Sequence, residues 1–299
     1  MQLIIRDLCK RYDNGVQALD RVSLTISAGM FGLLGPNGAG KSTLMRTLAT
    51  LQEADSGSAA LGDIDVLRDK DRVRRLLGYL PQDFGVYPKV TAWEMLDHFA
   101  RLKGVTRTKE RKKLVDALLA RTNLFAVRGQ KLGSFSGGMR QRFGIAQALI
   151  GNPKLIIVDE PTAGLDPEER VRFHNLLADI GHDVIVILST HIVSDVADLC
   201  SSFAVINQGR VLLAGKPQSC VAALHGKIWR CTVRRDELEA MQARLPVIST
   251  HLQAGETIVR IHADAPPEPS FEPVEPDLED VYFSTIAGHL DSAPLAQAT

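Results

Sequence analysis

The segment from Gly35 to Thr43 reads GPNGAGKST and fits the pattern G-x-x-x-x-G-K-[ST], with an apolar run before it and a helical pattern after it. Its glycines permit a tight loop whose backbone N–H groups can close on a phosphate, and the helix that follows directs its positive end toward the same anion. Lys41 suits the β- and γ-phosphate oxygens, and the Ser42 hydroxyl suits Mg²⁺. The predicted nucleotide-contacting residues are Gly35, Pro36, Asn37, Gly38, Ala39, Gly40, Lys41, Ser42 and Thr43.

Two acids follow an apolar run further along the chain. Residues 155–158 read LIIV, which is typical of a strand buried on both faces of a parallel sheet, and Asp159 and Glu160 come directly after it. Because α/β folds bind ligands at the carboxyl ends of their strands, these acids are expected near the phosphate loop. We expect Asp159 to join Ser42 in the Mg²⁺ shell and Glu160 to polarise the attacking water. The alternative for the acids on their own is an acidic turn after a core strand.

The order of helical and strand patterns predicts a three-layer α/β domain. Residues 1 to about 30 alternate apolar and polar and predict antiparallel strands with a turn near Asn14-Gly15. Residues 31–35 and 183–191 predict further buried strands, residues 91–122 are mostly helical, and residues 203–215 predict a hairpin around Gln208-Gly209. A helix from about Met139 to Ile150 is expected to begin at Ser136 or the two glycines after it.

The sequence changes character after Pro217, and residues 217–299 are predicted to form a small C-terminal α+β unit. Strands are expected at 228–234 and 256–263, with helices at 218–226, 236–245 and about 278–288. Residues 264–280 are rich in proline and acids and predict an extended acidic linker, and the end of the chain predicts a frayed tail. The predicted division is therefore 1–216, with a helical subdomain at about 84–150, followed by 217–299.

Composition limits the classes of partner. Lys and Arg number 35, as do Asp and Glu, and this balance argues against a dedicated nucleic-acid surface. The four cysteines are scattered and are expected to be buried hydrophobes in a reducing compartment. No apolar run approaches the roughly 18 residues that cross a bilayer, so a membrane role would require a partner.

Taken in order, these motifs resemble the ATP-binding subunits of ABC transporters over residues of about 3–216. The resemblance adds residues of that family's pattern: Tyr12 for stacking on adenine, Gln82 for the Q-loop that reaches Mg²⁺ and the water, and His191 for the switch histidine that senses γ-phosphate. Each of these three has an ordinary structural alternative when taken singly. The resemblance also implies that the segment 35–43 is the Walker A loop, that Asp159 and Glu160 are Walker B with its catalytic acid, and that Asp166 is part of the D-loop. The implied fold is a P-loop NTPase with an antiparallel β subdomain and a helical subdomain.

The same resemblance assigns the loop FSGGM at 135–139 to the ABC signature. It implies a head-to-tail homodimer in which Ser136, Gly137 and Gly138 contact the γ-phosphate of ATP held by the other subunit. One departure from the family pattern is Met139, where the common signature has Gln. The change removes one amide near the shared site, while the Ser and backbone contacts remain.

The segments LPQDFGVYPKVTAWEML and FSGGMRQR, with a C-terminal unit that ends in LEDVYF, resemble ATPases that pair with a separate integral permease of the type-2 export class. The resemblance implies an ATPase at the cytoplasmic face of the membrane, held there by the permease. Phe84 and Tyr87 are expected either to face that permease or to pack inside the helical subdomain. Two other functions stay open at this point: an ABC-type ATPase that acts on nucleic acid or the ribosome, and a regulatory ATPase without transport.

Overall fold

The computed structural model of the protein describes residues 1–162, 164–181 and 183–290. An antiparallel sheet forms one side of the molecule, in the strand order β2-β1-β4-β5. Its strands are β1 (Gln2–Arg11), β2 (Gln17–Ser27), β4 (Ser56–Leu61) and β5 (Ile64–Asp65). The predicted turn is confirmed, since Gly15 has a φ of 87° and its N–H donates to the Tyr12 carbonyl at 2.8 Å.

The central sheet has the order β10-β9-β3-β8-β7-β6. Its strands are β3 (Gly29–Leu34), β6 (Leu77–Leu80), β7 (Leu155–Asp159), β8 (Ile185–Thr190), β9 (Ser202–Asn207) and β10 (Arg210–Gly215). Among the described residues of this sheet, β10 pairs antiparallel with β9 and the other pairings are parallel. Leu34 pairs with Thr190, and Asp159 pairs with Ser189, so the segments that follow β3, β7 and β8 leave the sheet at the same edge. This edge therefore gathers the phosphate loop and Glu160, as the strand pattern predicts, together with His191, which the family resemblance implied.

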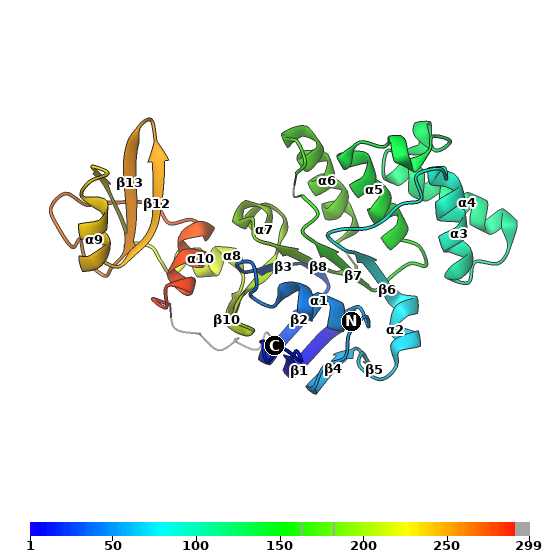
Figure 1. Cartoon of the computed structure of the whole chain (residues 1–299), viewed down its shortest axis with the longest axis horizontal. Coiled ribbons are helices and arrows are strands. Elements are labelled where there is room, and N and C mark those ends of the chain that lie inside the picture. The colour runs from blue at the N-terminus through cyan, green and yellow to red at the C-terminus, as the bar shows by residue number, and fades with distance from the viewer. Residues whose placement is uncertain (163, 182, 291–299) are drawn as a thin grey trace.

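Helices cover both faces of the central sheet (Figure 1). Helix α1 (Lys41–Leu48) lies between the two sheets, and α2 (Lys70–Leu76) leads into β6. The helical region, coloured from turquoise to green, contains α3 (Ala92–Leu102), α4 (Thr108–Arg121) and α5 (Gly137–Ala148), with 3-10 turns at Phe125–Val127 and Leu132–Ser134. Helices α6 (Pro167–Ile180) and α7 (Val193–Leu199) follow β7 and β8. Helix α3 begins with a capping box, because Thr91 and Glu94 each accept a hydrogen bond from the other's backbone.

The C-terminal unit lies at the opposite end of the molecule from the helical region (Figure 1). It contains α8 (Pro217–Ala222), β11 (Ile228–Val233), α9 (Leu238–Arg244), β12 (Val247–Gln253), β13 (Glu256–His262), β14 (Glu272–Pro273) and α10 (Leu278–Ile286). Its strands form an antiparallel sheet in the order β12-β13-β11-β14, with a small core of its own around Val259, Ile261 and Phe271. Strand β12 was not predicted, because its polar residues at 249–251 and 253 obscure the alternation.

The segment predicted to be an extended acidic linker is instead packed against this sheet. Phe271 is 5% exposed and Glu272–Pro273 pair with β11. The apolar side chain between the prolines explains the difference, since its burial fixes a segment whose charged neighbours remain in solvent. The predicted frayed tail falls mostly on residues 291–299, which lie outside the described residues.

The main hydrophobic core continues past the predicted boundary at residue 216. Leu224, Ile228, Leu278 and Val281 are buried in the same cluster as residues of α5, α6 and α7. Helix α10 contacts α7, α8, β9, β10 and β12. The sheet of the C-terminal unit thus has a small core of its own, but Ile228 on β11 and Ile248 on β12 join the residues of α10 in the main core. None of the helices that the structure describes is long and apolar enough to cross a bilayer.

Candidate functional site

The loop between β3 and α1 requires glycine for different physical reasons at different positions. A Cβ on Gly35 would lie 2.3 Å from the Ile206 carbonyl oxygen, so the close approach of β9 excludes a side chain there. Gly38 and Gly40 have φ values of 81° and 107°, in the left-handed region that disfavours other residues. A Cβ on Gly38 would meet nothing within 4 Å, so this part of the loop faces open space.

Lys41 is the first residue of α1, and its side chain is 5% exposed. Its Nζ donates to the carbonyl oxygens of Gly35, at 2.7 Å, and Pro36, at 3.1 Å. Burial lowers the pKa of Lys41, although the nearby carboxylates of Glu160 and Asp159 oppose that shift. The ammonium group is thus held beneath the loop, at the position predicted for contact with nucleotide phosphates.

A pocket of about 510 Å³ opens above the loop. The residues that line it are Tyr12, Val16, Ala18, Pro36, Asn37, Gly38, Ala39, Gly40, Lys41, Ser42, Thr43, Gln82 and Glu160. The Tyr12 hydroxyl lies 3.1 Å from Oγ1 of Thr43 and donates to Oε1 of Gln52 at 3.1 Å. The pocket therefore brings together the predicted base-stacking tyrosine, the phosphate loop and the predicted catalytic acid.

Asp159 and Glu160 differ sharply in environment. Asp159 is 3% exposed, and its Oδ1 atom is buried without a hydrogen-bond partner. Burial raises the pKa of Asp159 above its ordinary value. Glu160 has a φ of 46°, and its N–H donates to the Ser189 carbonyl at 2.8 Å. Such a left-handed conformation is costly for a non-glycine residue and is concentrated at functional sites.

The Glu160 carboxylate contacts three other predicted site residues. Its Oε1 lies 3.8 Å from Nζ of Lys41 and 3.3 Å from Nδ1 of His191, whose side chain is 47% exposed. Its Oε2 accepts from Nε2 of Gln82 at 3.3 Å. Four residues on separate segments of the chain thus converge, as the sequence motifs predict.

Comparison with known proteins identifies the same family that the sequence motifs resemble. Residues 19–163 match the ABC transporter family. The chain is 34% identical to the ABC transporter ATP-binding protein YxlF of Bacillus subtilis (strain 168) over 248 residues, which cover 83% of this chain and 81% of that protein. The chain belongs to the ABC transporter family.

Other relatives share the same cassette. The daunorubicin/doxorubicin resistance ATP-binding protein DrrA of Streptomyces peucetius is 34% identical over 258 residues, covering 85% of this chain and 75% of DrrA. The probable multidrug ABC transporter ATP-binding protein YbhF of Escherichia coli (strain K12) is 33% identical over 91% of this chain. The chain spans about half the length of YbhF, 49%.

Solved structures confirm the fold of the cassette. A dimeric structure of the ATP-binding cassette MJ0796, in a post-hydrolysis state bound to ADP and Pi, has a TM-score of 0.65 and 27% identity over 72% of this chain and 98% of that chain. An ATP-binding subunit of an ABC transporter has a TM-score of 0.67 and 27% identity, covering 82% of this chain and 100% of that chain. The predicted α/β cassette with antiparallel and helical subdomains is therefore confirmed.

The signature loop of this cassette lies apart from its own nucleotide pocket. Ser136 is exposed and caps α5, where its Oγ accepts from the Met139 N–H at 3.2 Å. Gly138 packs closely against α6, because a Cβ there would lie 2.2 Å from Oε2 of Glu169. Asp166 is exposed and caps α6 by accepting from the Glu169 N–H at 2.8 Å. Of the described residues, those lining the pocket do not include the signature loop or Asp166.

The two aromatic residues after Gln82 have different positions in the cassette. Phe84 is half-buried against the main core, and a Cβ on Gly144 of α5 would lie 2.9 Å from its ring. It therefore takes the internal packing that was one of its two predicted roles. Tyr87 is 69% exposed and remains available for a partner.

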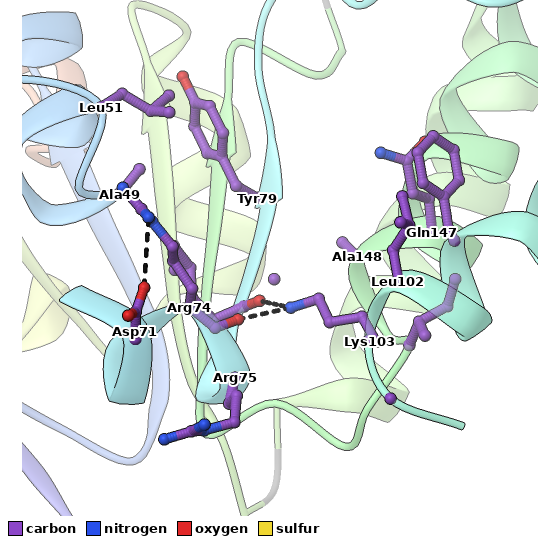
Figure 2. A pocket seen from close by; sticks show the side chains of 15 residues that line it. Ala49, Leu51, Asp71, Arg74, Arg75, Tyr79, Leu102, Lys103, Gln147 and Ala148 are labelled. Atoms are coloured by element: carbon purple, nitrogen blue, oxygen red, sulfur yellow. Dashed lines mark hydrogen bonds and ion pairs between the residues drawn. The ribbon is translucent and has the colours of Figure 1, made fainter. Parts of the chain in front are cut away.

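A second pocket, of about 730 Å³, lies between α3 and the α2–β6 segment (Figure 2). Lys103, at the end of α3, extends across it and donates to the carbonyls of Arg74, at 2.7 Å, and Leu77, at 2.8 Å. Burial lowers the pKa of Lys103. Leu51 and Leu102 line the pocket from opposite sides and are 63% and 71% exposed. We call this surface the α2–α3 groove; the sequence offered no signal for it, because its residues come from four separate segments.

The sequence did not predict two polar residues that bind to residues of the site or next to it. Gln52 accepts from Tyr12, and Asp195 accepts from Thr162 at 2.6 Å. Asp195 lies in the short helix VSDVADL, on the same side as the buried Val193 and Val196. An acid on the apolar side of a helix is the one feature of the sequence that could have pointed to this residue.

Proposed function

We propose that this chain is the ATP-binding and ATP-hydrolysing subunit of an ABC exporter. The observation that carries the proposal is the convergence of Lys41, Gln82 and His191 on the carboxylate of Glu160 at the mouth of one pocket. Phosphoryl transfer to water requires charge neutralisation and a positioned water, and this arrangement supplies a residue for each task.

The nucleotide would lie along the pocket from Tyr12 to Lys41. The ring of Tyr12 would face adenine, while the backbone N–H groups of residues 38–43 and the N-terminus of α1 would hold the phosphates. Lys41 would donate to the β- and γ-phosphate oxygens. Its present partners are backbone carbonyls, so a phosphate would replace neutral acceptors with charged ones.

The residues at the end of β7 fit a Mg²⁺ ion. Asp159 has a buried Oδ1 atom without a hydrogen-bond partner, and hard oxygen donors of this kind suit Mg²⁺. Ser42 and Gln82 would complete the protein's contribution to the shell, together with the nucleotide phosphates. When bound, the ion would neutralise charge on the phosphates.

Glu160 would hold the attacking water and accept its proton. His191 and Gln82, both at 3.3 Å from Glu160, would orient that carboxylate and contact the γ-phosphate region. The strained backbone at Glu160 supports this role, because the native contacts must stabilise an otherwise unfavourable conformation.

Two copies of the chain would enclose ATP between them. The exposed N-terminus of α5, with Ser136 and Gly137, offers N–H groups and a hydroxyl to a phosphate that its own pocket does not bring to it. A head-to-tail pair would place this loop on the other subunit's ATP, and Asp166 near the same interface. Loss of the γ-phosphate would weaken the contact between the two subunits, so ATP hydrolysis would allow them to separate.

The membrane partner would be a separate integral permease, which would hold the cassette at the cytoplasmic face of the membrane. The names of DrrA and YbhF, which concern drug resistance and a multidrug transporter, support the export class. We assign the α2–α3 groove, with exposed Leu51 and Leu102 and the exposed cation of Arg75, to an amphipathic cytoplasmic segment of the permease that carries acidic residues.

The ATPase proposal is tested by comparing the wild type with Glu160→Gln. The amide removes the proton acceptor but keeps the shape, so we expect ATP binding within about threefold of the wild type and phosphate release at least about 10²-fold slower. Equal turnover by the two proteins would remove Glu160 from the proposed role. A wild type without ATP turnover in the presence of Mg²⁺ and its membrane partner would contradict the function itself.

The permease proposal is tested by detergent extraction of membranes followed by co-purification on the tagged cassette. Leu102→Glu introduces a negative charge at the groove and should abolish recovery of the integral partner, with ATP binding unchanged. Leu252→Glu is the matched control, because Leu252 is 77% exposed and lies on β12 of the C-terminal unit. Equal recovery with both variants would contradict the assignment of the groove.

A further inference from the structure

Asp195, on α7, is a fully buried carboxylate outside the nucleotide pocket. Its exposed fraction is 0%, and donors from two other segments surround it. Its Oδ2 accepts from Oγ1 of Thr162 at 2.6 Å. Its Oδ1 lies 2.9 Å from Nε of Arg170 and 2.8 Å from Nε2 of His174. Arg170 also donates to Ser194 at 2.7 Å, so the guanidinium group binds two neighbouring residues of α7.

The electrostatic balance of this cluster favours the charged carboxylate. Burial pushes the pKa of Asp195 upward, but hydrogen bonds from His174 and Thr162 and the charge of Arg170 outweigh it, and the net pKa is lowered. A buried carboxylate that is paired and hydrogen-bonded in this way holds its partners in one geometry, because each loses a charge-assisted bond if it moves.

The position of the cluster relates it to Glu160 and His191. Two bonds join the segment that begins at Glu160 to the segment that begins at Ser189. The first runs from the Glu160 N–H to the Ser189 carbonyl at 2.8 Å, and the second from Thr162 to Asp195. The contact of 3.3 Å between Glu160 and His191 lies between these two ties. Removing the second tie takes away the bond that joins the two segments directly on the α7 side of the Glu160–His191 contact.

The same carboxylate also joins α7 to α6. Arg170 and His174 lie on α6, whose N-cap is Asp166, and the Arg170 N–H donates to the Asp166 carbonyl at 2.9 Å. This N-cap residue is the one that we placed at the dimer interface. Asp195 thus holds the segment after β7, the start of α6 and the segment after β8 against one another.

We propose that Asp195 is a positioning residue for ATP hydrolysis, which fixes Glu160 opposite His191 through its bonds to Thr162 and Arg170. The inference rests on the proposed ATPase function. Asp195 does not contact the pocket, so it acts through Glu160 and contributes little to ATP affinity. A displacement of about 1 Å at a catalytic group can lower turnover by about 10²-fold, and loosening one tie is expected to give part of that effect.

The test is Asp195→Asn, measured by steady-state ATPase kinetics and by equilibrium ATP binding. The amide keeps the size but presents an N–H group to donors and removes the charge that balances Arg170. We expect kcat to fall about tenfold or more while the ATP dissociation constant changes less than about threefold. In a Glu160→Gln background, Asp195→Asn should give no further decrease in turnover, because both substitutions act on the same step.

Asp97→Asn is the matched structural control. Asp97 is a buried carboxylate on α3 that is bonded to Arg111, within the helical region and away from the pocket. Its loss is expected to lower the midpoint of thermal unfolding while kcat per folded molecule stays within about twofold. A purely structural role for Asp195 would give the same result as this control.

Thr162→Val provides a second variant, which decides the matter if Asp195→Asn does not fold. It removes one donor and leaves the ion pair with Arg170 intact, so a decrease of about threefold or more in kcat at unchanged ATP affinity is expected. An unchanged kcat in a folded variant, or equal losses in the wild-type and Glu160→Gln backgrounds, would overturn the proposal. A wild type whose turnover does not depend on Glu160 would instead contradict the role proposed for Glu160, and a wild type without ATP turnover would contradict the ATPase assignment.

Discussion

Nζ of Lys41 lies 3.8 Å from Oε1 of Glu160, so the cation predicted to bind phosphate and the carboxylate predicted to hold water face each other across the pocket. Both side chains are largely buried, at 5% and 12% exposure. A nucleotide that enters between them would give Lys41 a charged acceptor and leave Glu160 to its bonds with Gln82 and His191. The two charged groups thus lie in contact at the pocket in which we propose that the phosphates of ATP bind.

Replacing Lys41 with methionine tests this relationship. The change removes the ammonium group but keeps an unbranched side chain in the buried site. Loss of a charge-assisted hydrogen bond should weaken ATP binding by about 2 kcal/mol, which titration calorimetry would measure. Glu160→Gln is the comparison, because it alters the opposite side of the contact and is expected to preserve affinity. Equal ATP affinity in Lys41→Met and the wild type would show that Lys41 does not bind phosphate.

The ring and the hydroxyl of Tyr12 are expected to affect ATP affinity differently. Removing the ring in Tyr12→Ala should weaken ATP affinity by roughly 1–2 kcal/mol, the scale of one lost base stack. Tyr12→Phe keeps the ring and removes only the bonds to Thr43 and Gln52, so its affinity should remain close to that of the wild type. If Phe and Ala weakened binding equally, the hydroxyl rather than stacking would account for the effect.

The sequence predicted most of the residues that line the pocket of about 510 Å³, because these residues are recognisable by local pattern. The phosphate loop needs glycines at fixed positions, and the structure gives the reasons: close approach of Ile206 at Gly35 and a positive φ at Gly38 and Gly40. Strands β3, β7 and β8 were predictable from their apolar runs, and their shared edge follows from the topology of α/β sheets. Strand β6 (Leu77–Leu80) was not predicted.

Other features depend on contacts between distant segments and were not predictable from local pattern. Asp195 receives donors from Thr162 and Arg170, more than twenty residues away in sequence. The α2–α3 groove joins segments from residue 49 to residue 150. The packed position of Phe271 was hidden by the prolines and acids around it, whose composition favours an extended chain.

The signature loop makes a prediction about association of two cassettes. Ser136→Arg places a long charged side chain at the exposed start of α5, and it should preserve ATP binding by the single chain but block ATP-dependent dimerisation. Ser136→Asp is a companion variant, because Asp also caps a helix well and should keep α5 stable, while its negative charge would repel the partner's γ-phosphate. Both are measured by light scattering with ATP in the Glu160→Gln background. Normal dimers with either substitution would contradict the trans contact of Ser136.

Asp280 gives a prediction for pH dependence. This carboxyl is 1% exposed and caps α10 together with Asp277. Burial raises the pKa of Asp280 from 3.8 to about 6, against the opposing effects of the Asp277 N–H and the charge of Arg260. Between these two values the folded protein retains a proton that the unfolded chain releases. The contribution of this group to the free energy of unfolding is therefore full below about pH 4, falls as the pH rises toward about 6, and is constant above that.

Asp280→Asn removes this titration but keeps an oxygen for the cap. Chemical denaturation at a series of pH values should show the wild type losing stability relative to the variant between about pH 4 and pH 6, with a constant difference at higher pH. Asp264→Asn removes a carboxylate that is 93% exposed and serves as the control for the change in net charge. A difference between wild type and Asp280→Asn that stays flat from about pH 4 to about pH 7 would mean that Asp280 is charged throughout this range, with Arg260 compensating its burial.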